Sequence, residues 1–139
     1  MESPETSNLP LRKGKAMKVL VCGSRYWTDY AMIHDRLSTL PLGTTIIQGM
    51  APGADSCARL AAIRLGFKYE DYPAKWSKYG KGAGPIRNQQ MIEQKPDLVI
   101  AFHEDFEKSK GTNDMLERAV DAIILWELIN AEGEVTLDG

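Results

Sequence analysis

The sequence alternates between short apolar runs and stretches with helical spacing, and this alternation constrains the fold more than any other feature. KVLVCG at 18–23, TTIIQG at 44–49 and DLVIAFH at 97–103 are largely apolar runs of strand length. Such runs are typical of strands buried on both faces of a parallel sheet. FKYEDYP at 67–73 alternates weakly and predicts a shorter strand, and EVTL at 134–137 predicts a last one.

A stretch with helical spacing follows each of the first four strands. The expected helices run from Thr28 or Asp29 to Pro41, from Asp55 to Gly66, from Pro85 onward after a glycine-rich loop at 77–84, and from Thr112 to about Asn130. Parallel strands need crossover connections, so this order places helices on both faces of one sheet. We therefore predict an α/β fold, a Rossmann-like three-layer sandwich with a mostly parallel central sheet of about five strands.

The end of the last helix is ambiguous. Leucine, valine and isoleucine recur at every fourth position from Leu116 to Leu128, which predicts one long helix. AIILW at 122–126 fits a buried strand equally well, because periodicity does not separate a short apolar strand from a buried helix. Both interpretations stay open at this stage.

Length and composition predict one soluble domain at 17–139, preceded by a polar, flexible tail at 1–16. The tail lacks the apolar region of a secretory signal, and no apolar run approaches the ~20 residues that span a bilayer. The chain holds two cysteines, Cys22 in a strand-like run and Cys57 in a helix-like run. This pattern indicates no disulfide framework and favours a reducing, cytoplasmic environment without a membrane partner.

Charge gives little indication of a nucleic-acid partner. The 17 basic and 19 acidic side chains leave a net charge of −2, so the whole chain carries no electrostatic footprint for a phosphate backbone. Arg12, Lys13, Lys15 and Lys18 form a local basic cluster. The cluster fits a solvated tail, and as the alternative it fits a basic arm that touches phosphates.

Ligands in open α/β sheets bind beyond the carboxyl ends of the strands, so the loops after the four predicted parallel strands hold the candidate site. In the first loop, Gly23 permits a tight turn, and Ser24 and Arg25 offer donors suited to a phosphate or carboxylate. Trp27 could stack on a base or simply pack against the next helix.

The second loop, QGMAPGAD, combines glycines with an acid at the start of a helix. Gly49 and Gly53 let backbone amides approach a ligand, and the helix directs its positive end to the same place. Asp55 either caps this helix or accepts hydrogen bonds from ribose hydroxyls.

The third loop contributes Arg87 and Asn88, which we expect in the first turn of a helix. An arginine at that position opposes the helix dipole, so Arg87 indicates a bound anion unless it is merely exposed. The preceding segment supplies a mobile lid or a solvated loop, and its lysines and aromatic residues are Lys75, Trp76, Lys78, Tyr79 and Lys81.

The fourth loop ends in SKGTND at 109–114, where Gly111 permits close approach and Thr112 is expected to cap a helix that could take a phosphate. Asp114 and Glu117 share a face of that helix; they either favour its N-terminus or place a carboxylate at a sugar's anomeric carbon. His103 is expected to be structural. Two histidines and two cysteines suggest no metal cluster, and no cofactor is indicated.

Taken together, VCGSRYWTD, IIQGMAPGADSCARLAA, GPIRNQQMIE and DLVIAFHEDFEKSKGTNDM resemble the SLOG superfamily of Rossmann-like proteins, most closely its cpYpsA-related branch, over residues 17 to 120. Relatives in this superfamily include LOG phosphoribohydrolases, nucleotide-sensing domains and DNA-processing proteins. The resemblance implies a Rossmann-like fold and a nucleotide-type ligand. Arg87 corresponds to a functional arginine of LOG enzymes, and Gly111 with Thr112 matches their P-G-G-x-G-T-x-x-E motif. Met115 stands at the position of that motif's catalytic glutamate.

Three functions follow as hypotheses. The first is a protein that binds a nucleotide or nucleotide derivative and, in its enzymatic form, hydrolyses the N-glycosidic bond of a nucleoside monophosphate with Arg87, Asp114 and Glu117. The second is a single-stranded DNA binding module that uses the lysines and aromatic residues of 75–81 together with the basic arm. The third is a non-catalytic sensor or sequestering protein for a signalling nucleotide. A homodimer through the apolar face of the last helix is a further hypothesis.

Overall fold

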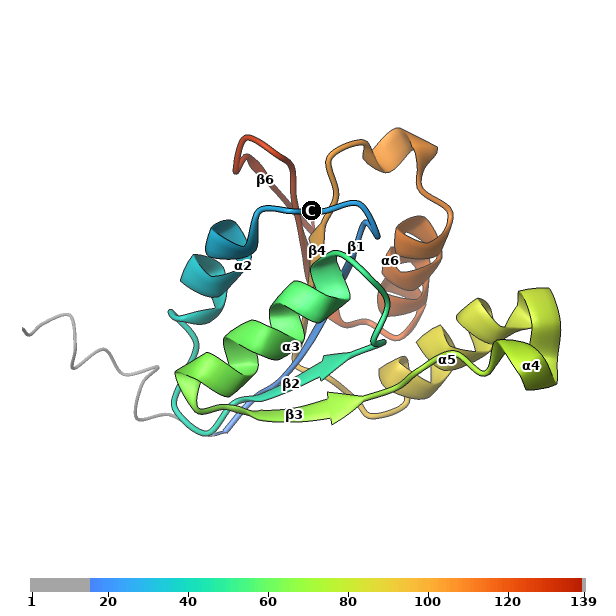
Figure 1. Cartoon of the computed structure of the whole chain (residues 1–139), viewed down its shortest axis with the longest axis horizontal. Helices are drawn as coiled ribbons and strands as arrows, with labels where there is room; N and C mark the ends of the chain where they lie inside the picture. Colours follow the sequence, from blue (N-terminus) through green and yellow to red (C-terminus); the bar gives the residue numbers. More distant parts are fainter. Residues whose placement is uncertain (1–15, 139) are drawn as a thin grey trace, which may run out of the picture.

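The computed structural model describes residues 16–138, so the predicted tail falls almost entirely outside the described residues. The chain forms an α/β fold with one six-stranded sheet in the order β3-β2-β1-β4-β5-β6, and the predicted Rossmann-like fold class is confirmed (Figure 1). All neighbouring strands are parallel except β5 and β6. The strands are β1 Lys18–Gly23, β2 Thr45–Gln48, β3 Lys68–Asp71, β4 Leu98–Phe102, β5 Leu125–Ile129 and β6 Val135–Leu137.

Helices cover both faces of the sheet (Figure 1). The helices are α2 Tyr30–Leu37, α3 Ala54–Leu65, α4 Trp76–Tyr79, α5 Ala83–Ile92 and α6 Gly111–Asp121, with short 3₁₀ turns η2 Gly80–Gly82 and η3 Phe106–Lys108. β1 explains the two layers, because Val19 and Val21 pack with α2 and α3 while Leu20 and Cys22 pack with α5 and α6. A strand with two buried faces has no polar alternation, as the sequence predicted.

The predicted long helix over 112–130 is wrong. α6 ends at Asp121, Ile123 adopts a left-handed backbone with φ 59°, and Leu125–Ile129 then pairs with β4. The alternative strand interpretation is the better one, although the strand begins three residues later than predicted. This added strand raises the predicted five to six.

Two further differences concern α5 and α6. α5 begins at Ala83 rather than Pro85, and α4 and η2 occupy most of the predicted loop at 77–84. Met115, Leu116 and Ala119 of α6 are buried against the sheet. These three residues are therefore part of the core, whereas Val120 of the same predicted face is 55% exposed, and the homodimer stays a prediction.

Two predicted helix boundaries are confirmed. The carboxylate of Asp29 accepts from the amide of Met32 and caps α2. Gly66 ends α3 with a left-handed φ of 76°. Within 16–138, no helix is both long and apolar enough to cross a membrane.

Candidate functional site

A cavity of about 780 Å³ opens at the carboxyl edge of the sheet. It lies where β1 and β4 are neighbours but lead to helices on opposite faces, since β1 continues to α2 and β4 to α6. Such a switch point is the usual ligand site of an open α/β sheet, and the volume lies within the ~300–1,000 Å³ of small-molecule pockets.

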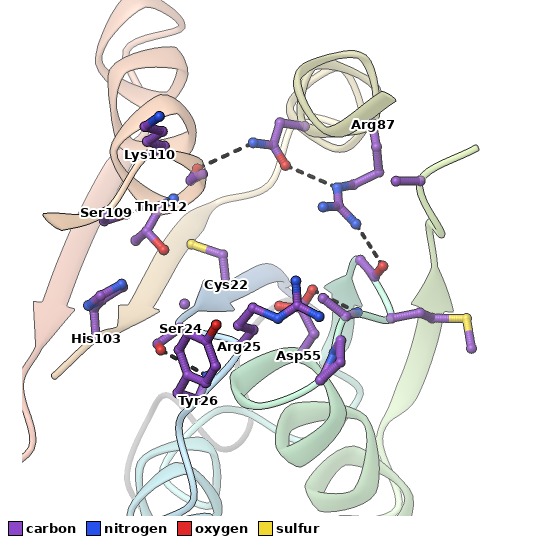
Figure 2. A pocket seen from close by; sticks show the side chains of 18 of the residues that line it. Cys22, Ser24, Arg25, Tyr26, Asp55, Arg87, His103, Ser109, Lys110 and Thr112 are labelled. Atoms are coloured by element: carbon purple, nitrogen blue, oxygen red, sulfur yellow. Dashed lines mark hydrogen bonds between the residues drawn. The ribbon is translucent and has the colours of Figure 1, made fainter. Parts of the chain in front are cut away.

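All four predicted loops contribute to this cavity, hereafter the cleft, and Figure 2 shows their side chains around a common space. Nine of the predicted site residues line it: Gly23, Ser24, Arg25, Gly49, Asp55, Arg87, Asn88, Gly111 and Thr112. Residues that are far apart in the sequence therefore meet in one cavity, as their positions at strand ends predicted.

Asp55 is a buried acid in the wall of the cleft. Gly53, not Asp55, occupies the N-cap of α3, so the predicted capping role is wrong. One oxygen of the Asp55 carboxylate instead accepts from the amide of Ala51 at 3.2 Å. Burial raises the pKa of Asp55 to about 6, although the positive charge of Arg87 and two backbone amides oppose this rise. The carboxyl group therefore changes its protonation state just below neutral pH.

Arg87 reaches the same wall from α5. It is the fifth residue of α5 and lies beyond the first turn in which the sequence placed it. Its Nη1 donates to the carbonyl oxygen of Gly49 at 2.7 Å, and its Nε donates to Oδ1 of Asn88 at 3.1 Å. These bonds fix the guanidinium without a bound anion.

Gly49 separates the acid from the arginine. A Cβ atom at Gly49 would lie 2.1 Å from Nη1 of Arg87 and 3.0 Å from Oδ2 of Asp55. Only glycine therefore fits between the two charged groups. Arg87 as a hydrogen-bond donor and Asp55 as an acceptor therefore lie on one wall of the cleft, on either side of the Gly49 backbone.

Ser24 holds the first loop in place rather than offering a free hydroxyl. Its Oγ donates to Glu104 at 2.9 Å and accepts from the amide of Tyr26 at 3.0 Å. Its carbonyl oxygen accepts from the amide of Ala54 at 3.0 Å. The neighbouring Arg25 is exposed and lines the cleft.

The start of α6 forms the opposite side of the cleft. The hydroxyl of Ser109 accepts from the amides of Thr112 and Asn113 at 3.0 and 3.2 Å, so Ser109 has the capping role predicted for Thr112. Lys110, which the sequence interpretation did not use, is exposed beside Gly111. The sequence SKGTN does indicate the cap at Ser109, because a serine three residues before a helical amide is a capping pattern.

Cys22 is a second cleft residue that the sequence interpretation did not select. Its side chain is buried at the end of β1 (Figure 2). Burial, reinforced by the nearby Asp55, raises the pKa of the thiol far above its usual range. Cys22 therefore presents a neutral sulfhydryl to the cleft.

Four predicted site residues do not line the cleft. The ring of Trp27 is buried against Phe102, with 5.5 Å between ring centroids, so it packs in the core instead of stacking on a base. Gly53 lies behind the cleft wall, where a Cβ atom would be 2.3 Å from the carbonyl oxygen of Ser24.

The two predicted catalytic carboxylates are the others. Asp114 accepts from Asn88 at 2.9 Å and from Arg118 at 2.8 Å, and Glu117 lines a separate groove beside Leu116. Neither side chain lines the cleft. Among residues 16–138, no three His, Cys, Asp or Glu side chains are grouped to hold a metal.

Three comparisons place the chain among known proteins. Residues 17–79 match the model of the YAcAr family, described as the YspA, cpYpsA-related SLOG family. The chain is 33% identical over 114 residues to the Gene 61 protein of Mycobacterium phage D29, across 76% of this chain and 90% of that relative.

The fold is similar to the X-ray structure of DNA processing protein A from Streptococcus pneumoniae. The TM-score is 0.63 at 22% identity, and the similarity covers 89% of this chain but only 53% of the other. The resemblance expected from the sequence is confirmed, and the chain belongs to the YspA, cpYpsA-related SLOG family.

Proposed function

We propose that this protein binds a nucleotide or nucleotide derivative in the cleft. The observation that carries the proposal is the arrangement of Asp55 and Arg87 on either side of Gly49, opposite a basic helix start in the same cavity. A nucleotide needs both parts, because its sugar offers hydroxyls and its phosphate carries negative charge.

We assign the phosphate to the part of the cleft between Arg25, which follows β1, and the start of α6. Arg25 presents a planar donor fork, and Lys110 adds a positive charge at the helix start. The amides and dipole of an 11-residue helix favour an anion at the same end.

The sugar is assigned to the wall formed by Asp55 and Arg87. An ionised carboxylate only accepts hydrogen bonds and a guanidinium only donates them, so a pair of ribose hydroxyls can satisfy both. Replacing the ribose by deoxyribose is then expected to weaken binding, since a desolvated Asp55 would lose a donor.

Calorimetric titration with nucleoside mono- and diphosphates, ADP-ribose derivatives and cyclic dinucleotides tests the proposal. We expect one of these classes to bind, and we expect Arg25→Ala to weaken it, with Arg64→Ala, an α3 arginine outside the cleft, as the matched control. Failure of every class to bind at low salt would refute the proposal.

A second candidate is hydrolysis of an N-glycosidic bond. The observation that favours it is a cleft carboxyl whose pKa of about 6 suits proton transfer near neutral pH. The hydroxyl of water would join C1′, and the departing base would take the proton. Mass spectrometry of a bound ligand after incubation separates the alternatives, because an unchanged ligand indicates a sensor or a sequestering protein.

Single-stranded DNA binding through α4 and η2 is the remaining alternative. Lys75, Lys78 and Lys81 lie in and beside these elements with the exposed rings of Trp76 and Tyr79, and the structurally similar protein is named for DNA processing. Oligonucleotide binding that falls with salt and is lost when these lysines are replaced would favour it. An unchanged affinity in the triple lysine variant would exclude it.

A further inference from the structure

Two exposed aromatic rings line the cleft, one on each of two loops. Tyr26 follows β1 and is 76% exposed, and Trp76 begins α4 after β3 and is 59% exposed. Single exposed aromatic residues are common on protein surfaces. Two of them on one polar cavity at strand ends are a specific arrangement, because aromatic faces are the surfaces on which nucleobases stack.

Both rings are held by the protein and are not merely free at the surface. The amide of Tyr26 donates to the hydroxyl of Ser24 at 3.0 Å, so the backbone that carries the ring is fixed. The Cη2 atom of Trp76 would lie 3.5 Å from a Cβ atom at Gly84, so one edge of the indole rests on the first turn of α5. Each ring therefore keeps a face available while its position is defined.

The two rings stand on loops that leave the sheet two strands apart. β2 lies between β1 and β3 in the sheet, which separates the two loops by about 10 Å, or two strand spacings. A single base held between two rings needs them about 7 to 8 Å apart, from two contacts of about 3.5 to 4 Å. The spacing is better suited to two bases, each on its own ring.

The groups between the rings fit the linkage of such a ligand. Arg25 is adjacent to Tyr26 and lines the cleft, so a positive charge lies where a linking phosphate would pass. Asp55 and Arg87 belong to the loop and helix that follow β2 and β3, where a sugar would lie between the two bases.

We infer that the cleft accepts a ligand with two nucleobases joined through phosphate, and that Tyr26 and Trp76 each stack on one base. The inference rests on the proposed nucleotide function and narrows its ligand class. A free dinucleotide and a single strand of DNA share this chemistry, and the experiment separates them.

Calorimetric titration tests the inference by comparing a monophosphate with its phosphate-linked dinucleotide. The two comparisons are adenosine monophosphate with the adenosine dinucleotide, and thymidine monophosphate with the thymidine dinucleotide. We expect the dinucleotide to bind about tenfold tighter than the monophosphate, since stacking on one further aromatic ring has about this effect. Trp76→Ala is expected to remove this gain.

Tyr69→Ala is the matched control, because Tyr69 is an exposed aromatic residue of β3 that does not line the cleft. It should leave both affinities unchanged. Equal affinities of monophosphate and dinucleotide, or a full dinucleotide gain in Trp76→Ala, would overturn the inference while the nucleotide function stands. If neither ligand class binds, the proposed function itself fails.

A longer deoxyadenylate strand, compared with the deoxyadenylate dinucleotide so that the sugar is the same, identifies the source of the two bases. If single-stranded DNA occupies the cleft, the strand binds tighter than the dinucleotide and its affinity falls steeply with salt. If a small dinucleotide is the ligand, the strand binds no tighter than the dinucleotide.

Discussion

Replacing Asp55 by asparagine is expected to stabilise the unliganded protein at pH 8 and to weaken ligand binding. Asp55 is 6% exposed, and its carboxylate has no salt bridge within the described residues. Burial raises its pKa from 3.8 to about 6. An acid whose pKa is higher in the folded state destabilises that state whenever it is ionised.

The magnitude follows from the two pKa values. The difference between 3.8 and about 6 corresponds to about 3 kcal/mol, at about 1.4 kcal/mol for each pH unit. Below about pH 3 the carboxyl is protonated in both states and costs nothing. As pH rises through this window the unfolded chain ionises first, so stability falls, and above about pH 7 the whole cost applies. Asparagine has nearly the same shape and no charge.

Urea unfolding of the wild type and Asp55→Asn at several pH values between 4 and 8 measures this effect. The stability difference should be about 0.5 kcal/mol at pH 4 and reach about 3 kcal/mol in favour of the variant at pH 8. Glu132→Gln, at an exposed acid whose side chain makes no hydrogen bond or salt bridge among the described residues, is the control and should show no such trend. A pH-independent difference, or a less stable Asp55→Asn at pH 8, would refute the argument.

Three further substitutions test the cleft. Gly49→Ala should displace the Arg87 guanidinium and weaken nucleotide binding about tenfold or more. Calorimetry measures the affinity, and circular dichroism checks that the variant is folded. An affinity equal to that of the wild type would contradict the close packing at Gly49. Lys110→Ala should lower affinity and reduce the salt dependence of binding, and an unchanged salt slope would remove Lys110 from the phosphate side. Asp114→Ala should lower the free energy of unfolding by about 1–3 kcal/mol, because Asn88 and Arg118 lose their acceptor, while ligand affinity changes little; lost turnover without lost stability would restore its catalytic role.

The fold could be predicted because a strand that is buried on both faces has an uninterrupted apolar sequence. Val19 to Cys22 alternate between the two helical layers, so no polar residue interrupts the run. β5 carried no such mark. Its Glu127 forms a salt bridge with Arg36 of α2, and its Trp126 and Leu128 are only partly buried. Helical spacing therefore dominated a segment whose strand pairing depends on β4.

The site could be predicted as a set of loops but not as a set of roles. The strand-end rule located Asp55 and Arg87, because it depends only on topology. Their partners depend on where helices begin, and boundaries set by tertiary packing are not visible in local sequence. Ser109 replaced Thr112 as a cap, and a start two residues earlier moved Arg87 out of the first turn of α5.

Gly53 packs the first two loops so closely against each other that we expect them to move together. Its neighbour Ala54 donates to Ser24, and no atom fits between Gly53 and the backbone of Ser24 and Arg25. If a ligand moves Arg25 toward the cleft, we therefore expect the first turn of α3, which includes Asp55, to move in the same direction. Recognition of the charged end and of the hydroxylated end of a ligand is then cooperative, and the cleft responds to a complete ligand more than to the sum of its fragments.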